Sequence, residues 1–243
     1  MEEHQVIDIS VDVVVFGFDG NTLKVLLIKQ APPTETFPEE KLQMAVPGDL
    51  IYGKDSLDDA ANRILKDCTA LEDIYLKQFH TFSDPSRVQG LKDQEWLRSF
   101  RANPERRVIT VSYYSLIKLV DYVPQPDPKS HASQAEWVDV YDIPSLAFDH
   151  NNIVTEGLKK LREELNTKHI GFELLPEKFT LSQLQKLYEI ILDKKFDKRN
   201  FRKNIKKLDH IIPLDEKQTG VLHKPAQLFT YDKEAKWKES IQP

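Results

Sequence analysis

The sequence has little cysteine, no long apolar run and no basic, apolar beginning. Cys68 is the single cysteine among 243 residues, which excludes an internal disulfide framework and fits a reducing cytosol. No stretch of about 18 apolar residues exists, so no membrane span is expected. The first residues, MEEHQVIDIS, are acidic and lack the features of a signal peptide. These absences predict a cytoplasmic protein without a membrane partner.

Charge is plentiful but unevenly distributed. The chain is 40% hydrophobic and 30% charged, enough for a sizeable core in one large domain or two modest ones. Its net charge of −5 combines a net of −9 over residues 1–169 with a net of +4 over residues 170–243. A basic C-terminal part is typical of a region that meets a polyanion.

The N-terminal part alternates between strand and helix patterns. Val11–Phe18 and Leu23–Ile28 are β-branched and apolar, and the Asp19–Asn21 turn signal between them predicts a hairpin. Further strands are expected at 74–82, 107–119 and 135–140, helices at 56–68 and 153–165, and a polar surface excursion between 83 and 106. This order predicts an α/β domain over residues 1–168.

The C-terminal part, residues 169–243, predicts two short helices followed by a hairpin. Thr180 and Gln183 form a capping box for a helix over Leu181–Leu192, and Asp197 caps a second helix that extends to about Leu208. Strands are expected at 211–214 and 228–231. Helix, helix, hairpin is the order of a winged helix-turn-helix.

The second of these helices has one apolar stripe and one cationic face. Phe201, Ile205 and Leu208 share a side at helical spacing, and only Asp197 is acidic within residues 194–207. Such a face could be an ordinary solvated surface, but it lacks the acidic partners that usually accompany one. We therefore expect it to bind DNA. The residues expected to touch DNA are Lys198, Arg199, Asn200, Arg202, Lys203, Lys206 and, on the hairpin, His223 and Lys224.

The stretch Val46–Leu71, VPGDLIYGKDSLDDAANRILKDCTAL, resembles the Nudix box of enzymes that cleave nucleoside diphosphates linked to another group. It keeps the Pro47-Gly48 pair and Arg63 at the box spacing. An amphipathic helix after a turn would be the simpler interpretation, and these retained residues argue against it.

The metal-binding positions of the box are eroded. Working boxes place glutamates at i, i+3 and i+4 on one helix face, where they hold Mg²⁺. Two of the three positions hold Ile64 and Cys68, and Asp67 alone is acidic. Isoleucine cannot bind a hard cation, and a thiol is a soft ligand. We expect no catalytic residue, no metal site and no cofactor.

Both halves together resemble the Nudix-related transcriptional regulators of the NrtR type, most nearly the degenerate-box regulators of sugar use of the Bacteroidetes AraR kind. The resemblance implies an N-terminal Nudix-like α/β/α sandwich with a mixed sheet, and a C-terminal winged helix-turn-helix that binds operator DNA as a homodimer. Besides the box, it is carried by Tyr113-Tyr114, Phe148–His150, GFELLP at 171–176, Phe179–Leu181 and DKRNFR at 197–202.

The resemblance also implies a small-molecule effector, either a pentose such as L-arabinose or an ADP-ribose-like compound. The eroded box favours a sugar bound without metal, and the insert at Leu91–Phe100 lengthens a loop near the expected pocket. The candidate ligand-binding residues are Lys29, Arg63, Tyr113, Asp149 and His150. Each has a structural alternative: Arg63 could pair with Asp59 or Asp67, Tyr113 could be core, and His150 could cap the following helix.

These observations predict a ligand-responsive transcriptional regulator, a repressor that releases DNA when the effector binds. One alternative is an active Nudix hydrolase of nucleoside diphosphate derivatives such as ADP-ribose, which turnover with Mg²⁺ would reveal. The other is a DNA-binding protein with an inert scaffold, which no ligand would stabilise.

Overall fold

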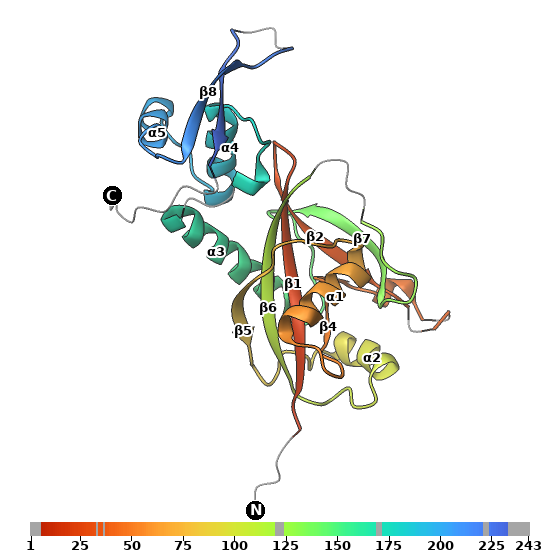
Figure 1. Cartoon of the computed structure of the whole chain (residues 1–243). Coiled ribbons are helices and arrows are strands. Elements are labelled where there is room, and N and C mark those ends of the chain that lie inside the picture. Colours follow the sequence, from red (N-terminus) through yellow and green to blue (C-terminus); the bar gives the residue numbers. More distant parts are fainter. Residues whose placement is uncertain are drawn as a thin grey trace, which may run out of the picture.

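A computed structural model describes residues 6–32, 34–35, 37–119, 124–168, 172–220 and 224–232. A mixed seven-stranded sheet with its helices makes the larger unit, and a smaller unit of two helices and a hairpin sits at one end of it (Figure 1). Within the described ranges, no helix is long and apolar enough to cross a membrane.

The sheet is built around two long strands, β1 (Asp8–Phe18) and β6 (Val108–Lys118), which pair in parallel along their whole length. Its main order is β3-β2-β1-β6-β5, with β4 paired to β1 and β7 to β2. The other strands are β2 (Leu23–Gln30), β3 (Met44–Ala45), β4 (Gly48–Leu50), β5 (Lys77–Phe82) and β7 (Ala132–Asp139). The expected hairpin is present as β1 and β2.

Strand β1 changes its neighbour halfway along. Phe16–Phe18 pair with β2, whereas Ser10–Asp12 pair with β4. Between these stretches the Val13 N–H donates to the Pro47 carbonyl at 2.8 Å. The splayed neighbours of β1 leave the polar side chains of its first half facing a space that other elements line.

One long helix covers each face of the sheet, so the predicted α/β/α sandwich is confirmed. Helix α1 (Leu57–Thr69) packs on Val11, Val13 and Val15, and helix α3 (His150–Lys168) packs on the opposite side of β1. Being covered on both faces explains why the second half of β1, from Val13 to Phe18, has no polar side chain. The expected capping box of α1 forms between Ser56 and Asp59.

The segment expected to be a polar surface excursion contains a helix, α2 (Leu91–Phe100), and that expectation is wrong. Trp96 and Leu97 are buried while Leu91 is 91% exposed. The buried residues Asp93, Trp96 and Leu97 do follow helical spacing, but Asp93 is charged and the apolar Leu91 is exposed, so hydrophobicity does not mark the buried face. Residues 83–90 run as turns that bring Arg87 into the interior.

The smaller unit is the winged helix predicted from the sequence. It contains η2 (Phe172–Leu174), α4 (Leu181–Leu192), α5 (Lys198–Ile205), β8 (Ile211–Lys217) and β9 (Gln227–Tyr231). Phe179 bridges to Phe229 and so adds a third strand segment to the β8–β9 hairpin. The apolar core runs without a break from the α3 face of the sheet into this unit. Helix α3 extends to Lys168, three residues beyond the end expected from the sequence.

Candidate functional site

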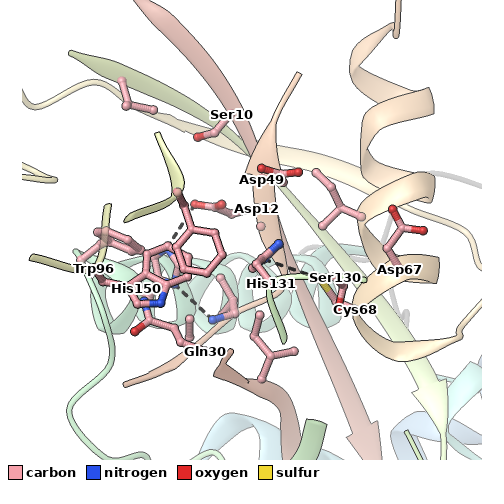
Figure 2. A pocket seen from close by; sticks show the side chains of 18 of the residues that line it. Ser10, Asp12, Gln30, Asp49, Asp67, Cys68, Trp96, Ser130, His131 and His150 are labelled. Atoms are coloured by element: carbon pink, nitrogen blue, oxygen red, sulfur yellow. Dashed lines mark hydrogen bonds and ion pairs between the residues drawn. The ribbon is translucent and has the colours of Figure 1, made fainter. Parts of the chain in front are cut away.

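A half-enclosed cavity of about 290 Å³ lies where β1 splays from its neighbours, between α1 and α2. Figure 2 shows Asp12, Gln30 and His150 on one side, Cys68 and Asp67 of α1 on the other, and His131 between them. Aromatic rings of Tyr52, Trp96, Phe100 and Phe148 line it beside these polar groups. Apolar walls with a few inward polar groups are typical of small-molecule sites.

A buried ionic cluster forms the cavity wall opposite α1. Arg87 donates two hydrogen bonds to Asp149, from Nε to Oδ2 at 3.0 Å and from Nη2 to Oδ1 at 2.6 Å. Its Nη2 lies 3.6 Å from Asp12 Oδ2, and Arg87 Nη1 also donates to the Thr110 hydroxyl. Arg87, Asp12 and His150 are each more than nine-tenths buried. Charges removed from water in this way are tolerated only when they are paired.

Burial shifts the two titratable groups that face each other across this cluster. Burial raises the pKa of Asp12 to about 6, against the opposing effect of Arg87. Burial, then repulsion from Arg87, lowers the pKa of His150 to about 3. His150 Nδ1 accepts from the Val46 N–H at 3.2 Å, so the neutral ring carries its proton on Nε2, which lies 3.5 Å from Asp12 Oδ2. His150 is therefore a neutral donor aimed at Asp12.

Two buried polar atoms at the cavity have no hydrogen-bond partner among the residues that the structure describes. They are Gln30 Nε2 and Asp12 Oδ2, and both residues line the cavity. Asp12 Oδ2 has only longer contacts, to Arg87 at 3.6 Å and His150 at 3.5 Å. A buried polar group without a partner costs about 1–3 kcal/mol, so a ligand that supplies the missing bonds gains from it. Gly48 permits the arrangement, because a Cβ there would stand 2.0 Å from Asp12 Oδ1.

Substituting Asp12 and substituting His150 should change the pH dependence of the free energy of unfolding in opposite directions. Between pH 4 and 6, Asp12 holds a proton in the folded state that it lacks in the unfolded state. Its contribution to the free energy of unfolding is therefore lost as the pH rises. His150 holds a proton only when unfolded, so its contribution is gained as pH rises. Relative to the unmodified chain, Asp12→Asn should gain about 1.4 kcal/mol of unfolding free energy per pH unit and His150→Gln should lose as much.

Urea unfolding at pH 4, 5 and 6 measures this. Differences from the unmodified protein cancel the titration of all other groups. Two variants whose stability runs parallel to that of the unmodified chain over this range would contradict the shifted pKa values of Asp12 and His150.

The box residues organise the loop ahead of α1. Arg63 donates to Asp55 Oδ2 at 3.0 Å, to the Leu50 carbonyl at 3.0 Å and to Asp49 Oδ2 at 3.4 Å. The alternative pairing with Asp59 or Asp67 does not occur, since Asp59 is used in the capping box. Arg63 lines the cavity but is held by its own loop.

The donors at the box do not fit a Mg²⁺ site. Ile64 and Cys68 are almost fully buried in the apolar cluster under α1. Burial raises the pKa of the Cys68 thiol far above its usual range, so it stays protonated, with Sγ 3.7 Å from His131 Nε2. The described residues include no group of three His, Cys, Asp or Glu side chains that could hold a metal ion. Asp67 alone cannot replace a carboxylate cluster around a hard cation.

The other candidate ligand-binding residues are dispersed. Asp149 and His150 belong to the cluster, and His150 begins α3 rather than capping it from outside. Lys29 pairs with Glu39 at 2.7 Å and does not line the cavity. Tyr113 is buried under α1, where its hydroxyl donates to Asp58 at 2.7 Å, away from the cavity lining. Of the five candidates, Arg63, Asp149 and His150 therefore lie at the cavity or in its ionic cluster, and Lys29 and Tyr113 do not.

The sequence did not indicate most of the residues that line the cavity, and Asp12, Gln30, Arg87 and Arg101 are the four on which its chemistry depends. Asp12 had a signal, because it is a carboxylate inside an otherwise apolar strand. Gln30 at the end of β2, Arg87 in a turn and Arg101 after α2 had none. Arg101 lines the cavity half-buried, and among the described residues no carboxylate lies within salt-bridge distance of it. Burial lowers the pKa of Arg101, which means that its charged form is poorly solvated, and an anionic or hydroxyl group of a ligand would stabilise it.

The second candidate site is the outer face of α5. Phe201 and Ile205 are buried, and Phe201 packs edge-on against Tyr188 of α4 at 5.8 Å. Lys198, Arg199, Asn200, Lys203 and Lys206 are exposed. No acidic side chain in the described part of the chain pairs with these four cations. The helix therefore presents an uncompensated positive face to solvent at the free end of the molecule (Figure 1).

Of the three other residues expected to contact DNA, the structure describes Arg202 and Lys224. Arg202 is partly buried, and its Nη2 donates to the Ser182 hydroxyl of α4 at 3.0 Å, so it joins the two helices. Lys224 is exposed on the chain entering β9. His223 lies outside the described residues.

Comparisons with known proteins assign both units. The family model of the NUDIX domain matches residues 7–157, and that of the NrtR DNA-binding winged helix domain matches residues 171–231. A curated relative from Acinetobacter baylyi, described as an ADPR responsive transcriptional repressor NtrR, is 26% identical over 226 residues, 91% of this chain and 81% of the relative.

Solved structures share the arrangement of both units. NrtR from Shewanella oneidensis, complexed with a 27mer DNA, is similar with a TM-score of 0.68 and 24% identity, covering 92% of this chain and 93% of that one. A MutT/nudix family protein from Enterococcus faecalis is similar with a TM-score of 0.69 and 20% identity, covering 96% and 89%. At these identities the likeness supports the fold alone.

Proposed function

Because the chain belongs to the Nudix family and is an NrtR-type Nudix-related transcriptional regulator, we propose that it is a repressor whose Nudix domain senses a hydroxylated effector. The observation that carries this proposal is the pairing, in one chain, of an uncompensated cationic helix in a winged helix with a polar, metal-poor cavity. The first supports binding to phosphates, and the second supports binding without hydrolysis.

The residues proposed to contact DNA are those of the exposed α5 face. In a helix-turn-helix the second helix enters the major groove, where lysine and arginine reach phosphates or guanine and asparagine suits adenine. We propose Lys198, Arg199, Asn200, Lys203 and Lys206 for this role, together with Lys224 near β9 and with His223, which lies outside the described residues. Arg202 acts indirectly through Ser182. A homodimer is part of the proposal, because two copies of α5 would read matching half-sites.

The effector is proposed to place sugar hydroxyls against Asp12 and Gln30. A hydroxyl can donate to Asp12 Oδ2 and accept from Gln30 Nε2, two atoms that make no hydrogen bond to any residue the structure describes. The ribose of ADP-ribose and a free pentose such as L-arabinose share this chemistry. The Acinetobacter relative, described as ADPR responsive, favours the first, and the eroded box favours the second. Arg101 and the exposed Lys129 are the cations available to a pyrophosphate at the cavity.

Hydrolysis is not part of the proposed function. The active-hydrolase alternative needs a metal cluster, and the donors that line the box helix do not fit one. ADP-ribose incubated with the protein and Mg²⁺ or Mn²⁺ is therefore expected to remain intact. Turnover that depends on the metal would revive that alternative.

The proposal is tested by fluorescence anisotropy of labelled duplexes taken from upstream of the protein's own gene and its neighbours. Tight binding that weakens steeply with salt, and that one of L-arabinose, other pentoses or ADP-ribose relieves, is the expected result. Binding no stronger than to a random duplex, across several upstream regions, would overturn the regulator. Binding that no compound relieves would leave a DNA-binding protein with an inert scaffold.

Three cavity variants test the proposed contacts. Two of them address the hydroxyl contact that both effectors share, and the third distinguishes ADP-ribose from L-arabinose. Asp12→Asn and Gln30→Met each remove one side of the hydroxyl contact and should weaken binding of the true effector by about tenfold or more. Arg101→Met should weaken ADP-ribose binding similarly but leave L-arabinose binding unchanged. Isothermal titration calorimetry with both compounds measures this, and Arg98→Met, on the exposed side of α2, is the control. Unaltered affinity in Asp12→Asn and Gln30→Met would exclude the proposed contact.

A further inference from the structure

Two side chains of the Nudix domain cap the end of α4 in the winged helix. Tyr141, just after β7, donates through its hydroxyl to the Ile190 carbonyl at 2.7 Å. Arg162 of α3 donates through Nε to the Ile191 carbonyl at 2.7 Å, and through Nη2 to the Tyr141 hydroxyl at 3.1 Å. The last carbonyls of a helix have no partner within it, and a cation is favoured at that negative end. Here two side chains of the Nudix domain supply the hydrogen-bond donors and the positive charge at the C-terminal end of α4.

The capped end of α4 leads directly into the turn that orients α5. Asp193 ends α4 in the left-handed conformation, with φ of 50°. The Glu189 carboxylate accepts from the Phe196 N–H at 3.0 Å, and Gln185 donates to the Phe196 carbonyl at 3.0 Å, which fixes the turn to α4. Phe201 of α5 then packs on Tyr188. Movement of the α4 end therefore carries α5 with it.

The opposite end of α3 touches the cavity. Asp149, immediately before α3, is held by Arg87, which lines the cavity. His150, the first residue of α3, also lines it. From Asp149 to Arg162 is 13 residues, so a helix rising 1.5 Å per residue spans roughly 20 Å between them. One rigid element thus joins the ionic cluster of the cavity to the cap of α4 (Figure 1).

We propose that Arg162 and Tyr141 are positioning residues that couple the cavity to the recognition helix. A ligand that draws Arg87 or Asp12 toward its hydroxyls changes the hold on Asp149, so α3 shifts and the α4 cap loosens. The winged helix then leaves the orientation that fits two half-sites. This inference rests on the proposed repressor function and adds the route by which its effector acts. It needs differential contacts in two states, as any allosteric coupling does.

The first test needs neither effector nor operator. Arg162→Met keeps most of the apolar stem and removes the donors, and Tyr141→Phe removes only the hydroxyl. Amide hydrogen exchange of residues 193–197 should be at least fivefold faster in the double variant than in the unmodified chain. The matched control is Lys159→Met with Tyr75→Phe, since Lys159 is exposed on α3 next to Glu156 and Tyr75 is 80% exposed. Equal exchange in test and control variants would overturn the cap.

The second test measures coupling. Operator affinity is determined with and without saturating ADP-ribose or L-arabinose, whichever relieves binding in the unmodified chain. Typical allosteric couplings weaken binding about 5- to 150-fold. In the double variant, saturating effector should weaken operator binding less than about threefold. A ratio equal to that of the unmodified chain would overturn the coupling role. If neither compound acts, the effector proposal fails, and Asp149→Asn substitutes for the ligand.

The substitute experiment is a double-mutant cycle on operator affinity between Asp149→Asn and Arg162→Met. Non-additive effects of threefold or more support the route through α3, and additive effects overturn it. If no duplex binds at all, the repressor proposal fails while the exchange experiment still decides whether the cap exists.

Discussion

Replacing Arg199 and Lys203 together with glutamate is expected to weaken operator binding more than 100-fold. Both side chains are exposed on α5, and no acidic group among the described residues pairs with them. Reversal removes two phosphate contacts and adds two repulsive ones, in a mode of binding governed by charge. The slope of log Kd against log salt should fall by roughly 2 as these contacts are lost.

Anisotropy titrations at several salt concentrations measure both effects. The matched control is the pair Lys54→Glu and Lys92→Glu, which makes the same change in net charge at exposed positions of the Nudix domain, far from α5. The control should bind almost as the unmodified chain does. If test and control weaken binding equally, DNA contact lies elsewhere than on α5.

The variant Arg87→Met should lower the free energy of unfolding by about 3–5 kcal/mol at pH 7. Arg87 is 8% exposed and is the cation shared by Asp149 and Asp12. Removing one partner of a buried ion pair leaves the other charge uncompensated, which accounts for a loss of this size. The same variant should lose effector binding, because the cavity wall would reorganise.

Denaturant unfolding at constant pH measures the loss. Arg98→Met breaks only an exposed pair, Arg98–Glu105 at 3.8 Å, and should cost no more than about 0.5 kcal/mol. The double variant Arg87→Met with Asp149→Asn should recover part of the stability, since one of the stranded charges is gone. Losses of equal size in Arg87→Met and Arg98→Met would show that the cluster contributes little.

Local patterns were sufficient to predict most of the fold. The capping residues Ser56 and Thr180 set the starts of α1 and α4 where the sequence placed them. The β-branched, apolar run Val11–Phe18 predicted β1 as a strand, and the Phe201–Ile205 spacing indicated which face of α5 is buried. Each of these signals depends on neighbours within one element. Helix α2 was missed because its buried face includes the charged Asp93 while the apolar Leu91 is exposed, so hydrophobicity does not mark that face.

The cavity could be predicted only in part. Sequence spacing located the eroded box, and two of the ligand-binding candidates suggested by the resemblance, Arg63 and His150, line the cavity. Lys29 and Tyr113 were expected there and lie elsewhere, because their pairings with Glu39 and Asp58 depend on loop paths. That Asp12 Oδ2 and Gln30 Nε2 make no hydrogen bond within the described part of the chain can be seen only when the surroundings of both are known.

By itself the sequence determined two things: the box helix lacks the carboxylates of a Mg²⁺ site, and α5 presents cations on one face. Both follow from residue type and the helical repeat, which need no distant partner. Tertiary structure alone decided that Asp12, Arg87 and Asp149 form one buried cluster, and that Arg162 reaches the end of α4. Those contacts join residues remote in the chain, and their energy arises from burial and pairing that no local pattern records.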